Sequence, residues 1–533
     1  MEQCWGLNCL EFPIKYLFSV VIDCVLNKKG VKKRKMLTQI LHGFQILFTL
    51  NIFIYLIGGL LMGIFFGSVP GLTATLAIAL LLPFTFTMKT IPALVTIMGI
   101  YAGGIFGGCL TAITINIPGA PASTMTMIEG YEMMKKGKGA SAIGHAAIAS
   151  GIGGMIGALI LMFVAPQMMK VALAFKSPER FSLIVVALIM VATVTRGSLL
   201  KGIISTLIGL AIATIGLDPL IPTPRFHFGI PYLMRGVGLL PAVTGLFAIS
   251  ELLRQMEFKQ WDIKLAQKIK ISDFIPSWSE IKKIGPFLYL KSAVIGNFVG
   301  ILPGGGASMA AFMAYGEAKR SSRYPEKFGT GIPEGIIAAE SANNAMCGGA
   351  LVPLLSLGIP GDAVTAIIFG VLLIQGMIPG PQLIVEHSGL IGTMFAALFT
   401  AQMLIPLVTF LLTPVYLRIT NLNRGLIFSF IAVIALVGTY VAEFSAFQMG
   451  LAVVMGVLAY FMQRAGYPIV PVLMGFILGP YLELFFRRSL TLGKGVAIFF
   501  TSPISAVLLL LAGLFLYILG VKRPHLEENN SKS

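Results

Sequence analysis

Long apolar stretches recur along the whole chain and constrain its fold more than any other feature. Residues 44–66, 389–412 and 496–519 are examples. A helix needs roughly 20 apolar residues to cross the hydrocarbon core of a bilayer. A β-barrel would show segments of about ten residues with alternating polarity, and these runs are continuously apolar. We therefore predict an all-α polytopic membrane protein with about ten to twelve transmembrane helices plus broken or re-entrant helices.

Composition and charge agree with a membrane protein. Hydrophobic residues make up 56% of the chain and charged residues only 11%, whereas a soluble domain carries about 25% charged residues. The net charge of +17 is explained by loops held on the cytoplasmic side, and no aromatic residues alternate with the cations as in a nucleic-acid surface. The basic clusters are Lys28 to Lys35, Lys135 to Lys138, Lys259 to Lys283, Lys319 to Lys327 and Arg487 to Lys494.

Cysteine and histidine spacing gives no sign of a disulfide framework or a zinc site. The five cysteines are unpaired in spacing, and no HExxH motif occurs. They are Cys4, Cys9, Cys24, Cys109 and Cys347. We expect no cofactor beyond a coupling ion.

The N-terminus stands apart from the rest of the chain. A weak apolar run, Tyr16–Leu26, precedes a Lys-rich patch, which is the reverse of the order in a signal peptide. An interfacial anchor or an upstream extension ahead of Met36 explains it. The predicted organisation is an N-terminal extension (1–35), a first transmembrane repeat (36–235), a connecting helix and basic linker (236–283), a second repeat (284–480), and a C-terminal helix with a polar tail (481–533).

An internal repeat is visible in the positions of Pro-Gly pairs. Gly67–Ala77 aligns without gaps on Gly300–Ala310, with Pro70-Gly71 matching Pro303-Gly304. Further on, each half has a Gly-Gly pair followed by an Ile-Pro-Gly triplet. These are Gly107-Gly108 before Ile117-Pro118-Gly119, and Gly348-Gly349 before Ile359-Pro360-Gly361, with one residue more between them in the second half. The matching order indicates duplication.

Such breaks have a specific consequence inside a membrane. Proline removes a backbone donor and glycine lets the chain reverse, so each pair interrupts a helix. Free backbone groups survive in hydrocarbon only where protein or a water-filled cavity covers them. The N–H groups at a half-helix start suit an anion, and freed carbonyls suit Na⁺. Paired breaks therefore predict a transport site near the bilayer midplane, although kinks in packed helices are the alternative.

Loop charges predict that the two halves have opposite orientations. In the first half the stretch after the Pro-Gly helix has one cation, Lys89, and the stretch after Ile-Pro-Gly is basic (Lys135–Lys138). In the second half the basic stretch (Lys319–Lys327) follows the Pro-Gly helix, and residues 375–389 have no Lys or Arg. By the positive-inside rule this swap implies a pseudo-two-fold axis in the membrane plane.

Polar residues gather in one apolar stretch of the second half. Glu340, Asn343 and Asn344 lie between Gly329 and the Pro360-Gly361 break. Ionisable groups at such depth are functional by default. The alternatives are an interfacial position for Glu340 and a purely interhelical role for the asparagines.

At these residues the chain resembles the large permease subunit of the tripartite tricarboxylate transporters, the TctA family. The similar segments are the runs PGLTATLAIALLLPFTF, YAGGIFGGCLTAITINIPGAPAS, GILPGGGASMAAFMAYGEAKR and FGTGIPEGIIAAESANNAMCGGALVPLLSLGIPGD. The resemblance extends from about Met36 to the C-terminal region. Three positions depart from the family pattern: Ala120 stands in place of Thr, Ala339 in place of Pro, and Asp362 in place of a small hydroxyl residue.

The resemblance implies a solute:cation symporter of the bacterial inner membrane. It also implies a small TctB-like membrane subunit and a periplasmic or lipid-anchored TctC-like binding protein. The implied substrates are citrate or related di- and tricarboxylates, driven by Na⁺ or H⁺. The alternatives are a transporter of another small organic anion or an intramembrane enzyme. Gly361-Asp362 is similar to part of a GxGD protease motif, but Ile359 departs from it.

The predicted site lies between the breaks of the two halves. The expected substrate-binding residues are Pro118, Gly119, Ser123, Thr124, Pro303, Gly304, Gly305, Ser308, Asn343, Asn344, Pro360, Gly361 and Asp362. The expected cation-binding residues are Thr73, Thr75, Glu340, Asn343 and Asn344. Half-helix N-termini and hydroxyls can hold a carboxylate without an arginine. Lys201 and Lys291 either add positive charge or extend to an interface.

Overall fold

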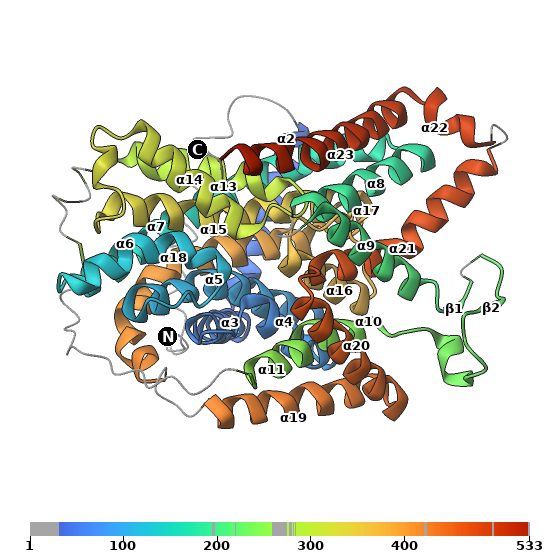
Figure 1. Ribbon diagram of the computed structural model, residues 1–533, viewed down its shortest axis with the longest axis horizontal. Coiled ribbons are helices and arrows are strands. Elements are labelled where there is room, and N and C mark those ends of the chain that lie inside the picture. Colours follow the sequence, from blue (N-terminus) through green and yellow to red (C-terminus); the bar gives the residue numbers. More distant parts are fainter. Residues whose placement is uncertain are drawn as a thin grey trace, which may run out of the picture.

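The computed structural model describes residues 31–194, 198–218, 220–257, 274–276, 280, 282, 284–419, 424–492 and 495–530. This part of the chain is almost entirely helical (Figure 1). Its one sheet is a pair of two-residue antiparallel strands, β1 (Gly216–Leu217) and β2 (Pro224–Arg225). The all-α polytopic class is therefore confirmed. Most of the N-terminal extension and of the basic linker lies outside the described residues.

The first half is a succession of helices separated by short connections. In order they are α2 (Val31–Leu47), α3 (Leu50–Ser68), α4 (Ala74–Thr87), α5 (Thr90–Ile115), η1 (Pro121–Ser123), α6 (Thr124–Lys135), α7 (Gly139–Leu173), α8 (Ser177–Val194) and α9 (Leu199–Ala213). After β1 and β2 come η2 (Pro231–Arg235), α10 (Leu239–Val243), the π-helical turn η3 (Thr244–Ile249) and α11 (Ser250–Gln255).

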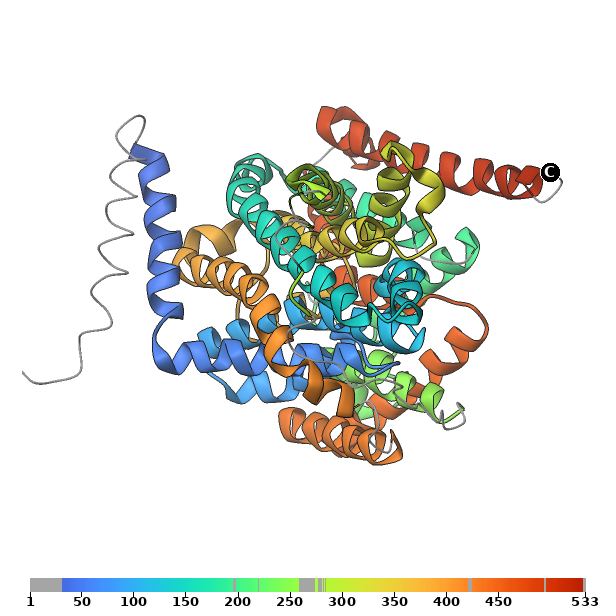
Figure 2. The same ribbon diagram turned by 90° about the vertical axis from the view of Figure 1, so that its left-hand side faces the viewer.

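The second half repeats much of this order. Its elements are α13 (Pro286–Ile301), α14 (Gly306–Ser321), η5 (Pro325–Lys327), α15 (Pro333–Leu357), α16 (Ala363–Ile374), α17 (Pro381–Glu386) and α18 (Ser388–Ile419). The chain ends with α19 (Arg424–Glu443), α20 (Ala446–Arg464), α21 (Ile469–Leu490), η6 (Gly495–Ala497), α22 (Ile498–Thr501) and α23 (Pro503–Asn530). Figure 2 shows α2 and α23 on opposite flanks of the bundle.

The helices divide into full-length and short apolar segments. Six described helices are long and apolar enough to cross a membrane, and a seventh candidate is the α22–α23 pair, which is bent by 86°. Five others, including α4, α13 and α16, are apolar but only 10–17 residues long. Short helices beside breaks are what interrupted spans produce. The number of ten to twelve spans stays a prediction.

The two halves share one order of elements and the same close contacts between them. Helices α3, α4, α5, α6 and α7 correspond to α13, α14, α15, α16 and α18. A methyl group added to Gly119 would lie 2.3 Å from the Gly67 oxygen, and one added to Gly361 would lie 2.6 Å from the Gly300 oxygen. In each half, therefore, glycine lets the two breaks touch.

The helix contacts of Gly67 and Gly300 change how the Gly-Gly helices of the two halves align. Gly67 lies against Gly104 and Gly107, while Gly300 lies against Met346 and Gly349. Gly107 therefore matches Gly349 rather than Gly348, and both Gly-Gly helices reach their Ile-Pro-Gly breaks with the same spacing. The second half does have one residue more between its Gly-Gly pair and its Ile-Pro-Gly triplet, because the pair lies one residue earlier relative to the helix contacts and not because a residue is inserted.

Contacts between the loops that follow the short helices join non-equivalent helices of the two halves. The Gln375 amide at the end of α16 donates to Thr85 O at 2.6 Å, and Thr90 Oγ1 donates to Gln375 Oε1 at 2.8 Å. At the end of α6, Lys136 Nζ donates to Thr330 O at 2.5 Å in the connection after α14. The end of α4 thus meets that of α16, and the end of α6 meets that of α14. These pairings favour the inverted orientation, which stays a prediction.

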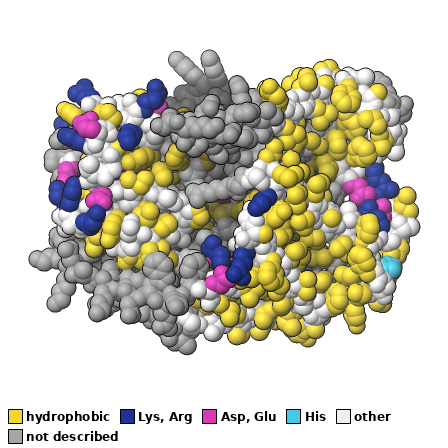
Figure 3. Space-filling model, in the orientation of Figure 1, with side chains coloured by type: hydrophobic (Ala, Val, Ile, Leu, Met, Phe, Trp, Pro, Cys, Tyr) yellow, Lys and Arg dark blue, Asp and Glu magenta, His cyan; other side chains and the backbone are white. Residues whose placement is uncertain are grey.

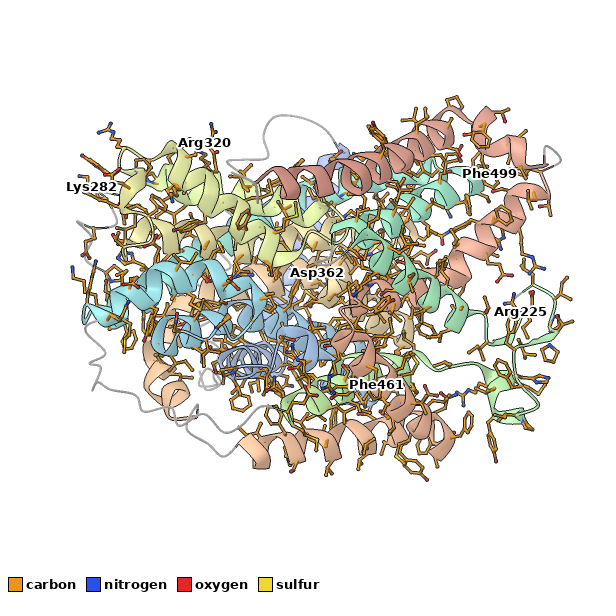
Figure 4. The ribbon with its side chains drawn as sticks, viewed as in Figure 1. Arg225, Lys282, Arg320, Asp362, Phe461 and Phe499 are labelled. Carbon is orange, nitrogen blue, oxygen red and sulfur yellow. The ribbon has the colours of Figure 1, made fainter. Side chains whose placement is uncertain are left out.

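One basic cluster lies at the wrong end for the expected sidedness. Lys282 and Arg320 lie at one end of the molecule, whereas Arg225 lies at the other (Figure 4). Arg487 Nη1 contacts Asp218 Oδ2 at 2.7 Å and Glu483 Oε1 at 3.1 Å, so it belongs to the Arg225 end. The assignment of the Arg487–Lys494 cluster to the same side as the other basic clusters was therefore wrong for Arg487.

Close helix packing at α3 provides a matched pair of test substitutions. A methyl group on Gly59 would lie 2.2 Å from Thr96 O of α5, whereas one on the adjacent Gly58 would meet nothing within 4 Å. Overpacking costs about 1–3 kcal/mol, whereas Ala in an open helical position gains about 1 kcal/mol over Gly. We expect Gly59→Ala to lower the melting temperature in detergent and Gly58→Ala to hold or raise it. Equal effects would contradict this packing.

Candidate functional site

The first-half break carries a buried hydroxyl without a partner. Residues 116–120 separate α5 from η1, and Gly119 N donates to Gly108 O at 3.2 Å. Ser123 at the end of η1 is fully buried, and its hydroxyl makes no hydrogen bond to any described residue. Thr124 instead donates to Pro121 O at 2.8 Å. An unpaired buried hydroxyl beside the first amides of α6 is suited to an anionic ligand.

The second-half break is closed by its own carboxylate. Asp362 is the N-cap of α16, and its Oδ1 accepts from Thr365 N at 2.8 Å and from Thr365 Oγ1 at 2.6 Å. Its Oδ2 accepts from Tyr101 Oη of α5 at 3.1 Å. We expected the free amides of α16 to face the substrate, but here Asp362 itself occupies them. The equivalent first-half residue, Ala120, has no carboxylate, so the two breaks differ in charge.

Short helices pack across the two halves beside both breaks. Helix α14 packs on η1 and α6, and α4 packs on α16. The first pairing brings η1 and α6 against α14, which contains Ser308 and directly follows Gly304 and Gly305. The second brings Thr73 and Thr75 to the Pro360–Asp362 segment. Thr73 caps α4 by accepting from Leu76 N at 3.3 Å. The predicted residues thus form two groups rather than one.

Glu340 of α15 joins the halves close to the α6 break. Its side chain is fully buried, and Thr126 of α6 and Ser150 of α7 donate to its two oxygens at 2.5 and 2.9 Å. No described cation lies beside the carboxylate. A carboxylate buried without a positive partner is stable only when it binds a proton or a cation. In the matching first-half position stands Met98.

The asparagines that follow on α15 lie deep in the bundle. Asn344 Nδ2 donates to Gln402 Oε1 of α18 at 2.7 Å and to Ala102 O of α5 at 3.3 Å. Asn297 of α13 donates to Gly157 O and Ala345 O, both at 3.2 Å. The Asn343 amide lies near the Glu340 carboxylate but makes no hydrogen bond to it.

Three amide oxygens in this layer make no hydrogen bond to a described residue. They belong to Asn297, Asn343 and Asn344, and all three side chains are buried. Uncharged carbonyl oxygens of this kind can coordinate Na⁺ in broken-helix transporters. Sequence reasoning missed Asn297 and Gln402, although each is the one amide side chain in its apolar helix and could have been noticed for that reason.

Within the described ranges no group of three or more His, Cys, Asp and Glu side chains is arranged to hold a metal.

Sequence reasoning also missed Glu129, which anchors the connection before α15. This buried α6 residue accepts from the amides of Gly329, Gly331 and Ile332 at 2.5, 2.7 and 3.0 Å, and from Tyr315 Oη at 2.8 Å. Gly329 and Gly331 have left-handed backbones (φ 92° and 86°), which favour glycine. In the sequence, only Gly329-Thr-Gly331 indicated a tight loop whose backbone amides would need a hydrogen-bond acceptor.

The two lysines considered for the site lie elsewhere. Lys291 Nζ is 2.6 Å from Glu317 Oε1, and Lys201 Nζ donates to Ala465 O at 2.6 Å. Both therefore have partners away from the breaks, and neither supplies a free positive charge to the substrate.

An apolar groove of about 660 Å³ lies between α3, α4, α18 and α19. Phe65, Phe66, Leu81, Phe84 and Phe430 are among its lining residues. It contains none of the predicted site residues. Hydrophobic side chains also cover much of the molecular face in Figure 3, as expected of a surface that lipid surrounds, while charged groups gather near its two ends and in one cluster at its lower middle.

Together these features define a polytopic membrane permease with duplicated broken helices. The sequence profile described as the tripartite tricarboxylate transporter TctA family matches residues 53–474. The chain belongs to this family.

Two relatives from Agrobacterium vitis support the assignment. One is described as an uncharacterized 52.8 kDa protein in the TAR-I ttuC′ 3′ region; it is 35% identical over 469 residues, covering 88% of this chain and 93% of the relative. The other, described as an uncharacterized protein in the TAR-II ttuC′ 3′ region, is 36% identical over 215 residues, covering 40% of this chain and 89% of the relative. No solved structure matches the chain.

Proposed function

We propose that the chain is the permease subunit of a transporter that imports citrate-like di- or tricarboxylates by symport with Na⁺ or H⁺. It works in a bacterial inner membrane with a small membrane subunit and a solute-binding protein that delivers the substrate. Membership of a tripartite tricarboxylate family supports the class of substrate and the two partners. The observation that carries the symport mechanism is the buried Glu340 carboxylate beside the α6 break.

The anion binds at the α6 side of the site. Helix α14 packs on η1 and α6 there, so the segment that precedes α6 lies beside an element of the second half. Ser123 contributes a buried hydroxyl with no described partner, and Ala120 leaves the break without negative charge. Helix N-termini attract anions through their unpaired amides and the helix dipole. The α16 break is unsuited to this role because Asp362 already fills it.

The coupling cation binds at Glu340. Thr126 follows Ser123 by three residues, which is about 4.5 Å along a helix axis, and Thr126 donates to Glu340. A substrate carboxylate at the α6 break is therefore close to another carboxylate. Two negative charges at such separation repel strongly in a medium of low dielectric constant. A proton or Na⁺ at Glu340 removes the repulsion, so anion and cation bind together.

Transport in proteoliposomes tests the proposal. The chain is reconstituted with the small membrane subunit and the citrate-loaded binding protein, and labelled citrate uptake is followed with and without an inward Na⁺ or proton gradient. We expect accumulation only with a gradient, and weak uptake by the chain alone. Strong high-affinity uptake by the chain alone would contradict binding-protein dependence. Gradient-independent equilibration would contradict symport.

The inverted orientation of the halves makes a separate prediction. Single cysteines at Lys89 and Lys327, on a background without other cysteines, should react with a membrane-impermeant maleimide from opposite sides. Lys89 lies in the connection that meets Gln375, and Lys327 lies near the connection that meets Lys136. Labelling of both positions from one side would rule out the inverted arrangement.

A further inference from the structure

An exposed aromatic loop stands out at the end of the molecule opposite the basic connections. It comprises β1, β2 and η2 with the residues between them, and Figure 1 shows it projecting beyond the end of α9. Phe226, Phe228 and Tyr232 are 60%, 75% and 67% exposed. Figure 4 places Arg225 of this loop far from Lys282 and Arg320. By the positive-inside rule we expect the basic connection around Arg320 to lie in the cytoplasm, which would place this loop on the outer side.

The base of the loop is held rigidly by charges. Arg225 Nη1 is 2.8 Å from Glu483 Oε1 and 3.4 Å from Asp218 Oδ2, and Arg487 contacts the same two carboxylates. The amides of Ile221 and Leu220 donate to Asp218 Oδ1. A network that fixes both strands to the end of α21 keeps the loop in one conformation.

This network resists acidification. Hydrogen bonds from the Ile221 and Leu220 amides, together with Arg487, hold the pKa of Asp218 below its usual range. Because the folded pKa is lower than the unfolded value of about 4, the stabilisation is complete above that value. It is lost only as the pH falls through the lower folded value.

The backbone at the tip is strained in a way that presents aromatic rings. Phe226 and Phe228 have φ values of 47° and 50°, a left-handed conformation that bulky residues rarely adopt. Such strain is concentrated at functional sites. Packing inside the protein does not explain it, because both rings are exposed. Tyr232 is positioned beside them by stacking on Phe447, with ring centroids 5.3 Å apart.

We propose that this aromatic loop is the docking surface for the substrate-loaded solute-binding protein. The inference rests on the proposed function, which requires such a partner on the outer side. Rigid exposed aromatic rings beside arginines are the usual centre of a protein interface. A membrane-interface belt uses mainly Trp and Tyr, whereas the tip consists of Phe226, His227 and Phe228, with four charged residues at its base.

The test uses the full chain with its small membrane subunit in lipid nanodiscs, and the citrate-loaded binding protein as the probe. The double variant Phe226→Asn/Phe228→Asn removes both rings at positions where Asn tolerates the left-handed backbone. We expect its dissociation constant to rise at least tenfold and its melting temperature to stay equal or rise. Phe287→Ala is the control, because Phe287 is 73% exposed at the start of α13, and it should bind as wild type does.

The outcomes separate the two proposals. Binding by the double variant within twofold of wild type would overturn the docking surface while leaving the proposed function in place. No binding by the wild-type complex would overturn both. A fluorophore at Phe228→Cys, on a background without other cysteines, gives an independent reading. Quenching by binding protein supports the proposal, whereas quenching only by brominated lipid assigns the loop to the membrane and overturns it.

Discussion

Replacement of Glu340 by Gln is expected to abolish gradient-driven uptake while the protein still folds. Gln keeps an oxygen that can accept from Thr126 or Ser150, so the contact between α15 and the first half survives. The variant cannot gain or lose a charge at this position. A proton-coupled carrier should then exchange citrate for citrate but fail to accumulate it. A sodium-coupled carrier should show a fall in Na⁺ affinity of tenfold or more, about 1.4 kcal/mol.

Glu334→Gln is the matched control for this experiment. Glu334 lies in the first turn of the same helix, is partly exposed, and contacts neither break in the described hydrogen-bond network. Its uptake should equal that of wild type at matched protein levels. Uptake by Glu340→Gln that retains its full dependence on both citrate and the cation would assign Glu340 a structural role.

Replacement of Glu129 by Ala is expected to lower stability more than any other single carboxylate change in α6. Three backbone amides in a partly buried setting lose their acceptor, and an orphaned buried donor costs about 1–3 kcal/mol. Because water can reach the exposed Gly329, we expect the free energy of unfolding to fall by about 1–3 kcal/mol in total. The connection between α14 and α15 should open, and the melting temperature measured by size-exclusion chromatography in detergent should fall markedly. Glu129→Gln, which keeps one acceptor, should give an intermediate value.

Glu132→Ala serves as the comparison, three residues further along α6. Glu132 pairs with Lys135 in an exposed i,i+3 contact, and such pairs contribute about 0–1 kcal/mol. Its melting temperature should be close to that of wild type. If Glu129→Ala and Glu132→Ala behaved alike, the anchoring of the Gly329–Ile332 loop would carry no energetic weight.

The breaks could be located from sequence because their cause is local. Pro118-Gly119 and Pro360-Gly361 are strong local helix breakers, and the structure ends α5 and α15 shortly before them. The burial of the polar residues of α15 could also be predicted, because Glu340, Asn343 and Asn344 lie in a stretch with few other polar residues. All three side chains are fully buried. These properties depend on neighbours along the chain.

Partners across the bundle could not be predicted in the same way. The Gly107–Gly349 match depends on how α3 and α13 pack against their neighbours, which no local motif encodes. The second oxygen of the Asp362 carboxylate accepts from Tyr101, which lies 261 positions away. Glu129 was missed because its role appears only when a loop from the other half meets α6. Long-range contacts of this kind decide which polar residues are free for ligand.

The central claim is that citrate and its coupling cation bind together between the α6 break and Glu340. Equilibrium binding of labelled citrate to the purified chain, titrated at several Na⁺ concentrations and pH values, tests it most directly. The account predicts cation-dependent binding that Ser123→Ala weakens at least tenfold and that Glu340→Gln makes independent of the cation concentration, with Glu334→Gln unchanged. Citrate binding that is unaffected by Ser123→Ala and stays fully cation-dependent in Glu340→Gln, in protein of wild-type stability, would contradict it.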